Sequence, residues 1–370
     1  MKKFLSIAAV AALCMSVFTA CDDDDFTPQP QPVYVTDGVF VVNEGASYSL
    51  IDGSLTYVAS DGKVTPHAFS TVNGRSLGGT PNDAVVSGDR LYIVVTDENT
   101  VEVIDRNTLK SIKQLNTVEL MGQEKGTQPR CVVAGGKYIF VSTYAGYVAR
   151  IDTDDYSTTV YQAGSYPEGM GLADGKLYVA NSDYGSGINP SVSIIDLADG
   201  TSRNVTDPAI LNPVKLAAVG GGMYILDSGT YATGSQTESG VRKFVDGKVE
   251  KIIDATLMAV DEQRGLIYTV NAPYSYTVTP AQYNVYDMKT GENRQFVAGD
   301  EIDSPVEIAV DPESGDVYVT SLKNSPDTGY PDYNADGYMV RYSSGGIFKA
   351  RYDTGVNPGT IVFNSTVTYE

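Results

Sequence analysis

The chain has 370 residues, and its 46 acidic residues outnumber 26 basic ones, which gives a formal charge of −20 at pH 7. A field of this sign repels phosphate backbones, so the composition argues against nucleic acid as a partner.

Residues 1 to 20 are typical of a signal peptide. Lys2 and Lys3 precede the apolar run Phe4 to Phe18, which is short for a helix that spans a bilayer. Phe18-Thr19-Ala20-Cys21 has the form of a lipobox, with Phe where Leu is usual, and predicts a lipid on Cys21. An ordinary signal peptide followed by an incidental cysteine is the alternative. Cleavage before Cys21 leaves 24 basic residues against 46 acidic ones, a formal charge of −22, and Cys131 as the remaining thiol, so no disulfide framework is expected.

Residues 21 to 35 form an acidic, proline-rich tether. Asp22 to Asp25 follow Cys21 directly, and Phe26 to Pro32 alternate proline with other residues. Acidic residues behind a lipidated cysteine resemble the export signal of lipoproteins displayed on the bacterial surface; a tether that faces the periplasm is the alternative. Alternating prolines favour polyproline II, in which a dozen residues span about 35 Å. We therefore expect a protein that is lipid-anchored in the outer membrane and exposed at the cell surface.

Residues 36 to 370 carry seven copies of one pattern, and such internal repeats decide the fold. Each copy starts at a proline or its equivalent and continues through a short apolar stretch, a Gly/Asp turn and an aromatic residue inside a β-branched run. The starting residues are Pro81, Pro129, Pro167, Pro213, Ala255, Pro305 and Pro358. The seventh copy is split, because it begins at Pro358 to Phe363 and continues at Gly38 to Val42. One blade is therefore expected to contain both chain ends, which closes the ring and hides two sheet edges.

Strand-length apolar runs punctuated by Gly and Asp, without a helical period, predict an all-β fold. A third strand also recurs, as in Val103-Ile104-Asp105, Ser193-Ile194-Ile195-Asp196 and Asn284-Val285-Tyr286-Asp287. This pattern resembles the YVTN-type repeat of YncE-like proteins. The resemblance implies a seven-bladed β-propeller across residues 38 to 363.

In a propeller the first strand of each blade lines a central channel. The side chains that follow the starting residues should therefore ring its mouth. The candidates for ligand contact there are Asn82, Arg130, Glu168, Lys215 and Glu307. This ring mixes acids with bases, unlike a set of metal ligands.

Tyrosines gather in the loops between second and third strands. Four of these loops are long: Asn181 to Ser191, Asp227 to Gly240, Asn271 to Tyr283 and Ser321 to Tyr338. They are expected to carry Tyr184, Tyr231, Tyr274, Tyr276, Tyr283, Tyr330, Tyr333 and Tyr338, with Tyr48 in the split blade and Tyr166 before Pro167. Tyrosine combines a rigid apolar face with a hydroxyl at low entropy cost, so the set predicts a binding face. The alternative is that each ring packs its own loop. The strand aromatics Phe40, Tyr92, Phe140, Tyr178, Tyr224, Tyr268 and Tyr318 are expected in the core.

Catalytic motifs are missing. The sequence has no Gly-x-Ser-x-Gly elbow, Cys/His metal spacing or phosphate loop, and its one histidine, His67, lies in an expected turn. We therefore predict no catalytic residues and no required cofactor, although the many carboxylates leave an acid/base pair open. Asp332, Asn334 and Asp336 match the first half of a calcium loop, but Ser343 replaces the bidentate Glu at its twelfth position. Calcium there and a simple polar turn are both open.

An acidic lipoprotein start followed by a seven-bladed propeller resembles the BtuG family. The resemblance implies a surface lipoprotein that binds cobalamin (vitamin B12) or a related corrinoid on the tyrosine face. It also implies transfer to an outer-membrane TonB-dependent transporter of the BtuB type. No short motif specifies cobalamin, so this ligand depends on the family resemblance. A surface module that binds protein or glycan and a metal-dependent propeller lactonase or lyase are the alternatives; the absence of Trp counts against a sugar platform.

Overall fold

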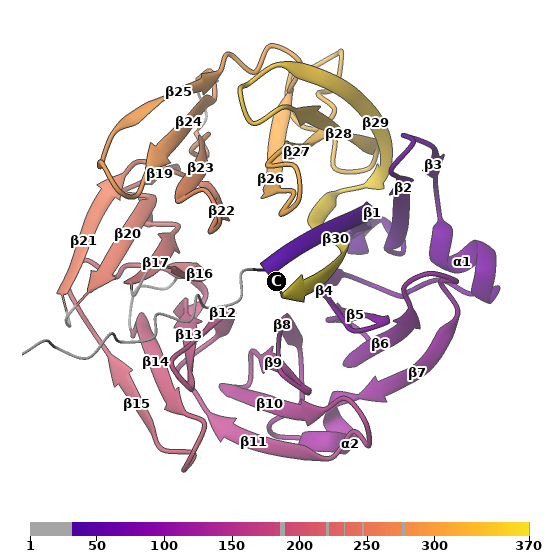
Figure 1. Ribbon diagram of the computed structural model, residues 1–370, viewed down its shortest axis with the longest axis vertical. Helices are drawn as coiled ribbons and strands as arrows, with labels where there is room; N and C mark the ends of the chain where they lie inside the picture. Colours follow the sequence, from indigo (N-terminus) through magenta and orange to yellow (C-terminus); the bar gives the residue numbers. More distant parts are fainter. Residues whose placement is uncertain are drawn as a thin grey trace, which may run out of the picture.

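The computed structural model describes residues 32–185, 189–219, 222–232, 234–245, 248–275 and 279–369. These residues form a ring of seven four-stranded antiparallel sheets around one axis (Figure 1). The prediction of a seven-bladed β-propeller is therefore confirmed. The signal peptide, Cys21 and the acidic run lie outside the described residues, as does Tyr276.

The blades are numbered from the split one, and their strands are given from the channel outward. Blade 1 contains β30 (Pro358–Tyr369), β1 (Pro32–Asn43), β2 (Ser54–Ala59) and β3 (Val64–Thr65); blade 2 contains β4 (Pro81–Ser87), β5 (Arg90–Val95), β6 (Thr100–Asp105) and β7 (Ser111–Asn116); blade 3 contains β8 (Pro129–Gly135), β9 (Tyr138–Thr143), β10 (Tyr147–Asp152) and β11 (Thr158–Gln162).

Blade 4 contains β12 (Pro167–Ala173), β13 (Lys176–Asn181), β14 (Ser191–Asp196) and β15 (Ser202–Val205); blade 5 contains β16 (Pro213–Val219), β17 (Gly222–Asp227), β20 (Gly240–Val245) and β21 (Lys248–Ile253); blade 6 contains β22 (Leu257–Asp261), β23 (Leu266–Asn271), β24 (Gln282–Asp287) and β25 (Asn293–Val297); blade 7 contains β26 (Ser304–Val310), β27 (Val317–Leu322), β28 (Asp336–Tyr342) and β29 (Phe348–Val356). Short elements decorate this ring: the hairpin of β18 (Thr230–Ala232) and β19 (Ser235–Thr237), the helices α1 (Ala68–Asn73) and α2 (Thr117–Met121), and the 3₁₀ turns η1 (Ser47–Ser49) and η2 (Asp183–Gly185).

The repeated prolines mark where inner strands begin. Five inner strands start at the expected proline, whereas β26 starts one residue before Pro305 and β22 starts two residues after Ala255. Proline suits the first position of a strand because it has no N–H to pair. The residue before four of these prolines has a positive φ, between 51° and 55°, which turns the chain sharply from one blade into the next: Thr80, Gln128, Tyr166 and Asn357.

Both chain ends build blade 1, as the split repeat predicts. Antiparallel pairing of β1 with β30 runs from Pro32 opposite Tyr369 to Asn43 opposite Pro358. Beyond the blade, residues 32–37 and 365–369 continue as a two-stranded ribbon whose outer end lies near the centre of the ring in Figure 1. The Thr36 hydroxyl donates to Asp311 at 2.7 Å, which ties this ribbon to blade 7.

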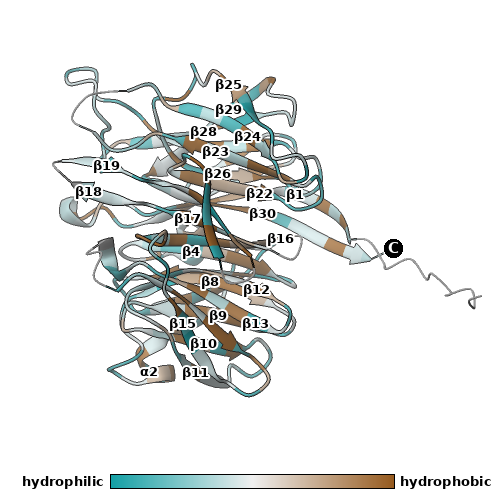
Figure 2. Cartoon of the chain, turned by 90° about the vertical axis from the view of Figure 1, so that its left-hand side faces the viewer, coloured by the Kyte–Doolittle hydropathy of each residue, from teal (hydrophilic) through white to brown (hydrophobic). Residues whose placement is uncertain are grey.

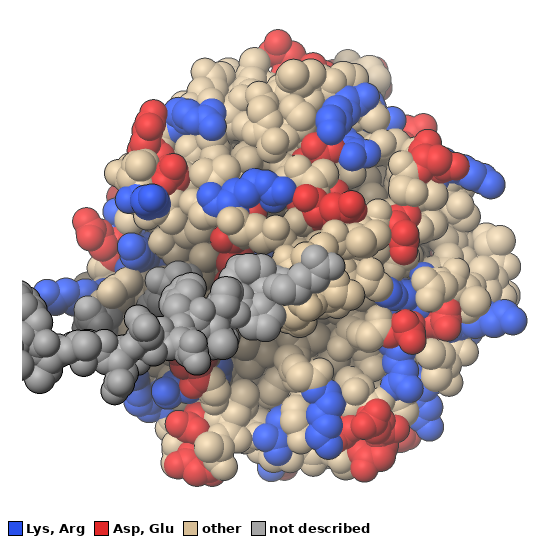
Figure 3. Space-filling view, viewed as in Figure 1, with Lys and Arg blue, Asp and Glu red and all other residues tan. Residues whose placement is uncertain are grey.

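The ribbon distinguishes the two faces of the ring. It projects from one face, called here the ribbon face, whereas β18 and β19 project from the opposite one (Figure 2). The connections between the second and third strands of the blades lie on this opposite face, called here the loop face. On the ribbon face, acidic and basic side chains are interspersed around the ring (Figure 3).

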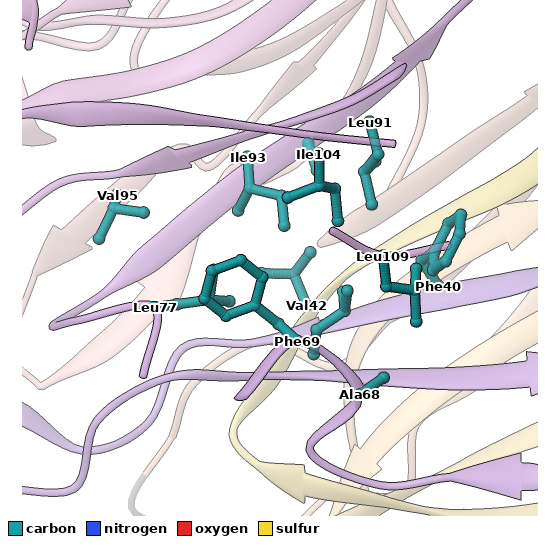
Figure 4. Packing of buried hydrophobic residues seen from close by; sticks show 12 residues of the cluster. Phe40, Val42, Ala68, Phe69, Leu77, Leu91, Ile93, Val95, Ile104 and Leu109 are labelled. Carbon is teal, nitrogen blue, oxygen red and sulfur yellow. The ribbon is translucent and has the colours of Figure 1, made fainter. Parts of the chain in front are cut away.

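The core lies between neighbouring blades. Phe40 and Val42 of β1 pack against Leu91, Ile93 and Val95 of β5, and all five are wholly buried (Figure 4). The prediction that the strand aromatics lie in the core is confirmed. Tyr178 is partly buried and packs on a neighbouring core cluster. The other six are buried: Phe40, Tyr92, Phe140, Tyr224, Tyr268 and Tyr318. In the described part of the chain, no helix is long and apolar enough to cross a bilayer.

Phe40→Ala tests how strongly this core depends on the split blade. Removal of a wholly buried ring leaves a cavity, so we expect the free energy of unfolding to fall by about 3 to 5 kcal/mol in urea titrations. The control is Ile347→Ala, because that side chain is 71% exposed and its truncation should cost less than about 0.5 kcal/mol. Similar losses in the two variants would contradict this account of the core.

Candidate ligand-binding face

A pocket with a volume of about 490 Å³ lies between blades 6 and 7 on the loop face. Tyr274, Tyr330 and Tyr333 line it and are 54%, 50% and 58% exposed. Four prolines and several aliphatic side chains complete walls whose charged members are Asp300 and Asp303. Among the described residues, no Lys or Arg lines this pocket. The pocket can therefore bind an uncharged group with apolar surface, and its two carboxylates disfavour binding of an anionic group.

The hairpin β18–β19 of blade 5 holds the backbone of Tyr274. The Gln236 N–H donates to the Tyr274 carbonyl at 2.8 Å, and the Tyr274 N–H donates to Gln236 Oε1 at 3.1 Å. Gln236 Nε2 also donates to the Ser228 carbonyl at 2.9 Å. Blade 5 thus positions a pocket residue of blade 6.

A buried ion pair supports the base of this hairpin. Arg242 Nη1 lies 3.6 Å from Asp227 Oδ1, and the two side chains are 2% and 0% exposed. Asp227 accepts backbone N–H groups from Leu211, Asn212 and Gly229, while Arg242 donates to the carbonyls of Glu238 and Gly240. Burial raises the pKa of Asp227, and the Arg242 charge opposes that shift. The pair joins the residues before β16 to both ends of the hairpin loop.

Three further tyrosines form a cluster on the same face at blades 3 and 4. The ring centroids of Tyr144, Tyr166 and Tyr184 are 5.2 to 5.7 Å apart, with Tyr144 edge-on to both others. Tyr184 is 70% exposed and Tyr166 is 38% exposed, whereas Tyr144 is partly buried. This group is called here the tyrosine cluster.

Polar side chains near the starts of the inner strands contact Tyr144 of the tyrosine cluster. Arg130 Nη1 donates to Asn82 Oδ1 at 2.6 Å, and Arg130 Nε donates to Glu168 Oε2 at 3.3 Å. The Tyr144 hydroxyl donates to Glu168 Oε1 at 2.5 Å, and the Arg130 guanidinium lies 4.6 Å from the Tyr144 ring centroid. Burial and the Glu168 charge raise the pKa of Tyr144, so this hydroxyl remains a donor.

A second ion pair crosses the mouth between blades 5 and 7. Lys215 Nζ donates to Glu307 Oε1 at 2.9 Å. Two more carboxylates face this region: burial raises the pKa of Asp83 to about 6 and that of Glu44 to about 7. Glu44 accepts from Asn357 Nδ2 at 3.0 Å.

The structure therefore brings the five predicted mouth residues into two groups: Asn82, Arg130 and Glu168 in one, Lys215 and Glu307 in the other. Each charge has an internal partner. Glu44 and Tyr144 were not predicted as site residues. Glu44 directly follows β1, the strand that the split repeat located. Its position after this strand is the sequence signal that could have identified it as a residue of the channel mouth.

Seven predicted tyrosines are exposed on the loop face: Tyr48, Tyr166, Tyr184, Tyr231, Tyr274, Tyr330 and Tyr333. The placement of Tyr283 and Tyr338 in loops was wrong. Tyr283 lies in β24 opposite Val270, and Tyr338 lies in β28 opposite Ser321. They are 3% and 0% exposed, because both rings pack in the core between blades near the start of their strands. Tyr283 contributes a wall of the pocket from below.

The segment predicted to bind calcium is a hydrogen-bonded turn. Asp332 Oδ1 accepts the Asn334 N–H at 3.0 Å, and Asn334 Oδ1 accepts the Ser49 hydroxyl at 2.5 Å. Within the described ranges, no group of three or more His, Cys, Asp or Glu side chains could hold a metal ion. Calcium at Asp332, Asn334 and Asp336 stays a prediction.

These features define an all-β propeller with a tyrosine-lined loop face. The chain belongs to the DUF5074 family, described as a domain of unknown function, whose match covers residues 37–302. No curated protein matches the chain.

Solved structures share the fold at low identity. A 6-phosphogluconolactonase candidate from Bacteroides uniformis has a TM-score of 0.57 at 12% identity, with 88% of this chain and 99% of that chain covered. Hydrazine synthase from Kuenenia stuttgartiensis has a TM-score of 0.56 at 14% identity, with 78% and 95% covered. The WD40 repeats of RRP9 have a TM-score of 0.51 at 8% identity, with 74% and 80% covered. At these identities the likeness is one of fold.

Asp227→Asn tests the buried ion pair at the base of the β18–β19 hairpin. The variant leaves the Arg242 charge buried without its counter-ion, so we expect a loss of about 3 to 5 kcal/mol in unfolding free energy. Asp254→Asn is the matched control: Asp254 pairs with Lys251 at 2.7 Å, but its side chain is 69% exposed, and such pairs contribute about 0 to 1 kcal/mol. Equal losses by denaturant titration would show that the buried pair has no special role.

Glu44→Gln tests the pKa shift at the channel mouth. Because the folded-state pKa is about 7 against an ordinary 4.5, the folded protein retains this proton longer than the unfolded chain as pH rises. The contribution of Glu44 to stability is therefore complete below pH 4.5 and is lost towards pH 7. Glutamine cannot ionise, so the variant should gain about 3 kcal/mol relative to wild type between pH 4.5 and pH 7.5. Parallel stability curves would contradict the shift.

Proposed function

We propose that this protein is a lipid-anchored surface protein that binds a corrinoid such as cobalamin on its loop face and passes it to an outer-membrane TonB-dependent transporter. The observation that carries the proposal is the tyrosine-lined pocket between blades 6 and 7, together with the tyrosine cluster on the same face. The choice of a corrinoid follows the resemblance to the BtuG family.

The chemistry of the pocket suits such a ligand. A corrinoid combines a broad ring system with many uncharged amide arms. Tyr274, Tyr330 and Tyr333 offer flat apolar surface, and Gln236 and Asn324 line the same walls as polar side chains. Ligand pockets are typically apolar with a few polar groups that fix orientation, in volumes of about 300 to 1,000 Å³.

The position of Pro32 suits display of the loop face. Pro32, where the described chain begins, lies on the ribbon face, opposite the loop face. A lipid on Cys21 would therefore attach the protein from the side away from the pocket. The acidic run Asp22 to Asp25 and the lipobox support export to the cell surface.

A protein or glycan ligand is the second candidate, because exposed tyrosines also stack on sugars and anchor protein interfaces. A metal-dependent lactonase or lyase is the third. The fold likeness to the Bacteroides uniformis protein favours it. Against it, Glu168 and Glu307 at the channel mouth are already paired with Arg130 and Lys215.

Two measurements, each made with and without EDTA, separate these three functions: calorimetric titration of the protein with cyanocobalamin and an assay of lactone hydrolysis. We expect tight binding that EDTA leaves unchanged. No binding would contradict a corrinoid ligand and favour a protein or glycan. Turnover of a lactone that EDTA abolishes would instead establish the enzyme.

Tyr333→Ala and Tyr274→Ala test the pocket directly. Each removes an aromatic face from the pocket wall, and we expect each to weaken cyanocobalamin binding by about 1 to 3 kcal/mol with an unchanged melting temperature. Tyr369→Ala is the control, since that side chain is 68% exposed on the ribbon. Unchanged affinity in both pocket variants would remove this pocket from the proposal.

A further inference from the structure

The tyrosine cluster is held in place by its own hydrogen bonds. The Ser182 N–H and hydroxyl both donate to the Tyr166 carbonyl, at 3.1 and 3.2 Å. The Tyr184 N–H donates to Ser182 Oγ at 3.1 Å. Ser182 thus joins the backbones of the two exposed tyrosines, and Tyr144 is fixed below them by Glu168. Aromatic rings that are ordered before binding lose little entropy when a ligand contacts them.

The backbone that presents Tyr184 is strained. Asp183 and Tyr184 both have φ of 52°, and they are the one adjacent pair of non-glycine residues with positive φ among the described residues. The positive φ of Tyr166 belongs to the propeller repeat, since Thr80, Gln128 and Asn357 share it. The positive φ angles of Asp183 and Tyr184 do not recur as a pair in the described residues of the other blades, so the propeller repeat does not explain them. Strain of this kind, about 1 to 3 kcal/mol per residue, concentrates at functional sites.

The cluster and the pocket lie on opposite sides of the channel mouth. Blades 3 and 4 carry the cluster and blades 6 and 7 carry the pocket, with blade 5 between them on one side and blades 1 and 2 on the other. The mouth between them presents the internally paired groups of Arg130 with Glu168 and Lys215 with Glu307. Each pair is neutral as a whole, whereas the carboxyl groups of Asp83 and Glu44 face the same region.

The pocket is too small for a whole corrinoid. Its volume of about 490 Å³ lies in the lower half of the range for drug-sized ligands, about 300 to 1,000 Å³, and a corrinoid with its amide arms and nucleotide loop is larger than such ligands. Most of the ligand must therefore lie outside the pocket.

We propose that Tyr144, Tyr166 and Tyr184 form a second contact site, and that a single ligand bridges it to the pocket across the channel mouth. This inference rests on the proposed function. It specifies a broad ligand that places apolar surface on the tyrosines of both sites and hydrogen-bonding groups over the mouth. Tyr166 and Tyr184 contact the ligand, whereas Tyr144 positions them.

The experiment is calorimetric titration with cyanocobalamin of the wild type and of Tyr184→Ala, Tyr184→Phe, Tyr333→Ala and the double variant Tyr184→Ala/Tyr333→Ala. We expect one ligand per chain, at least tenfold weaker binding in Tyr184→Ala, and most of the affinity restored in Tyr184→Phe, which retains the ring. The double variant should bind more weakly than either single variant. Melting temperatures should match wild type, because Tyr184 is exposed.

The matched control is Tyr369→Ala, the same change at an exposed tyrosine of the ribbon. Two bound ligands per chain, or an affinity of Tyr184→Ala within twofold of Tyr369→Ala while Tyr333→Ala is weakened, would overturn the bridging inference and leave the proposed function standing. Absence of binding in the wild type would overturn both.

Discussion

Antiparallel pairing of β1 with β30 is the constraint on which the rest of the structure depends. It brings residues more than 300 positions apart into one blade and closes the ring of seven sheets. Each core cluster is formed by side chains of two neighbouring blades. If the ring were open, the side chains of the cluster that contains Phe40 and Val42 would be exposed on one side. Closure also sets the geometry of function, since it fixes the loops of blades 3 to 7 around one axial opening.

Most of the fold could be predicted from the residues, because the evidence was repeated seven times. The prolines located the inner strands to within two residues, and the split copy located the closure. The predictions were wrong where they depended on a single residue and not on the repeat. Tyr283 and Tyr338 stand at the junction of a loop and a strand, and composition alone does not tell which of the two an inward-facing tyrosine joins.

The site was less predictable than the fold, for a physical reason. Residue type predicted exposed tyrosines, but their division into a pocket and a cluster depends on contacts between blades, such as Gln236 with Tyr274. The pairing of Arg130 with Glu168 and of Lys215 with Glu307 also needs the closed ring. Short-range sequence patterns do not predict such contacts between residues of different blades. The buried pair of Asp227 with Arg242 shows the same dependence, because a charge pair deep in blade 5 supports a residue of blade 6.

We propose that one large ligand lies across the loop face. Hydrogen exchange of the whole protein with and without saturating cyanocobalamin tests it most directly, because backbone protection reports where a ligand orders the chain. The account predicts slower exchange around Tyr184 and in residues 323–335, with no change in the β1–β30 ribbon. Protection confined to the ribbon face, or no protection at all, would contradict it.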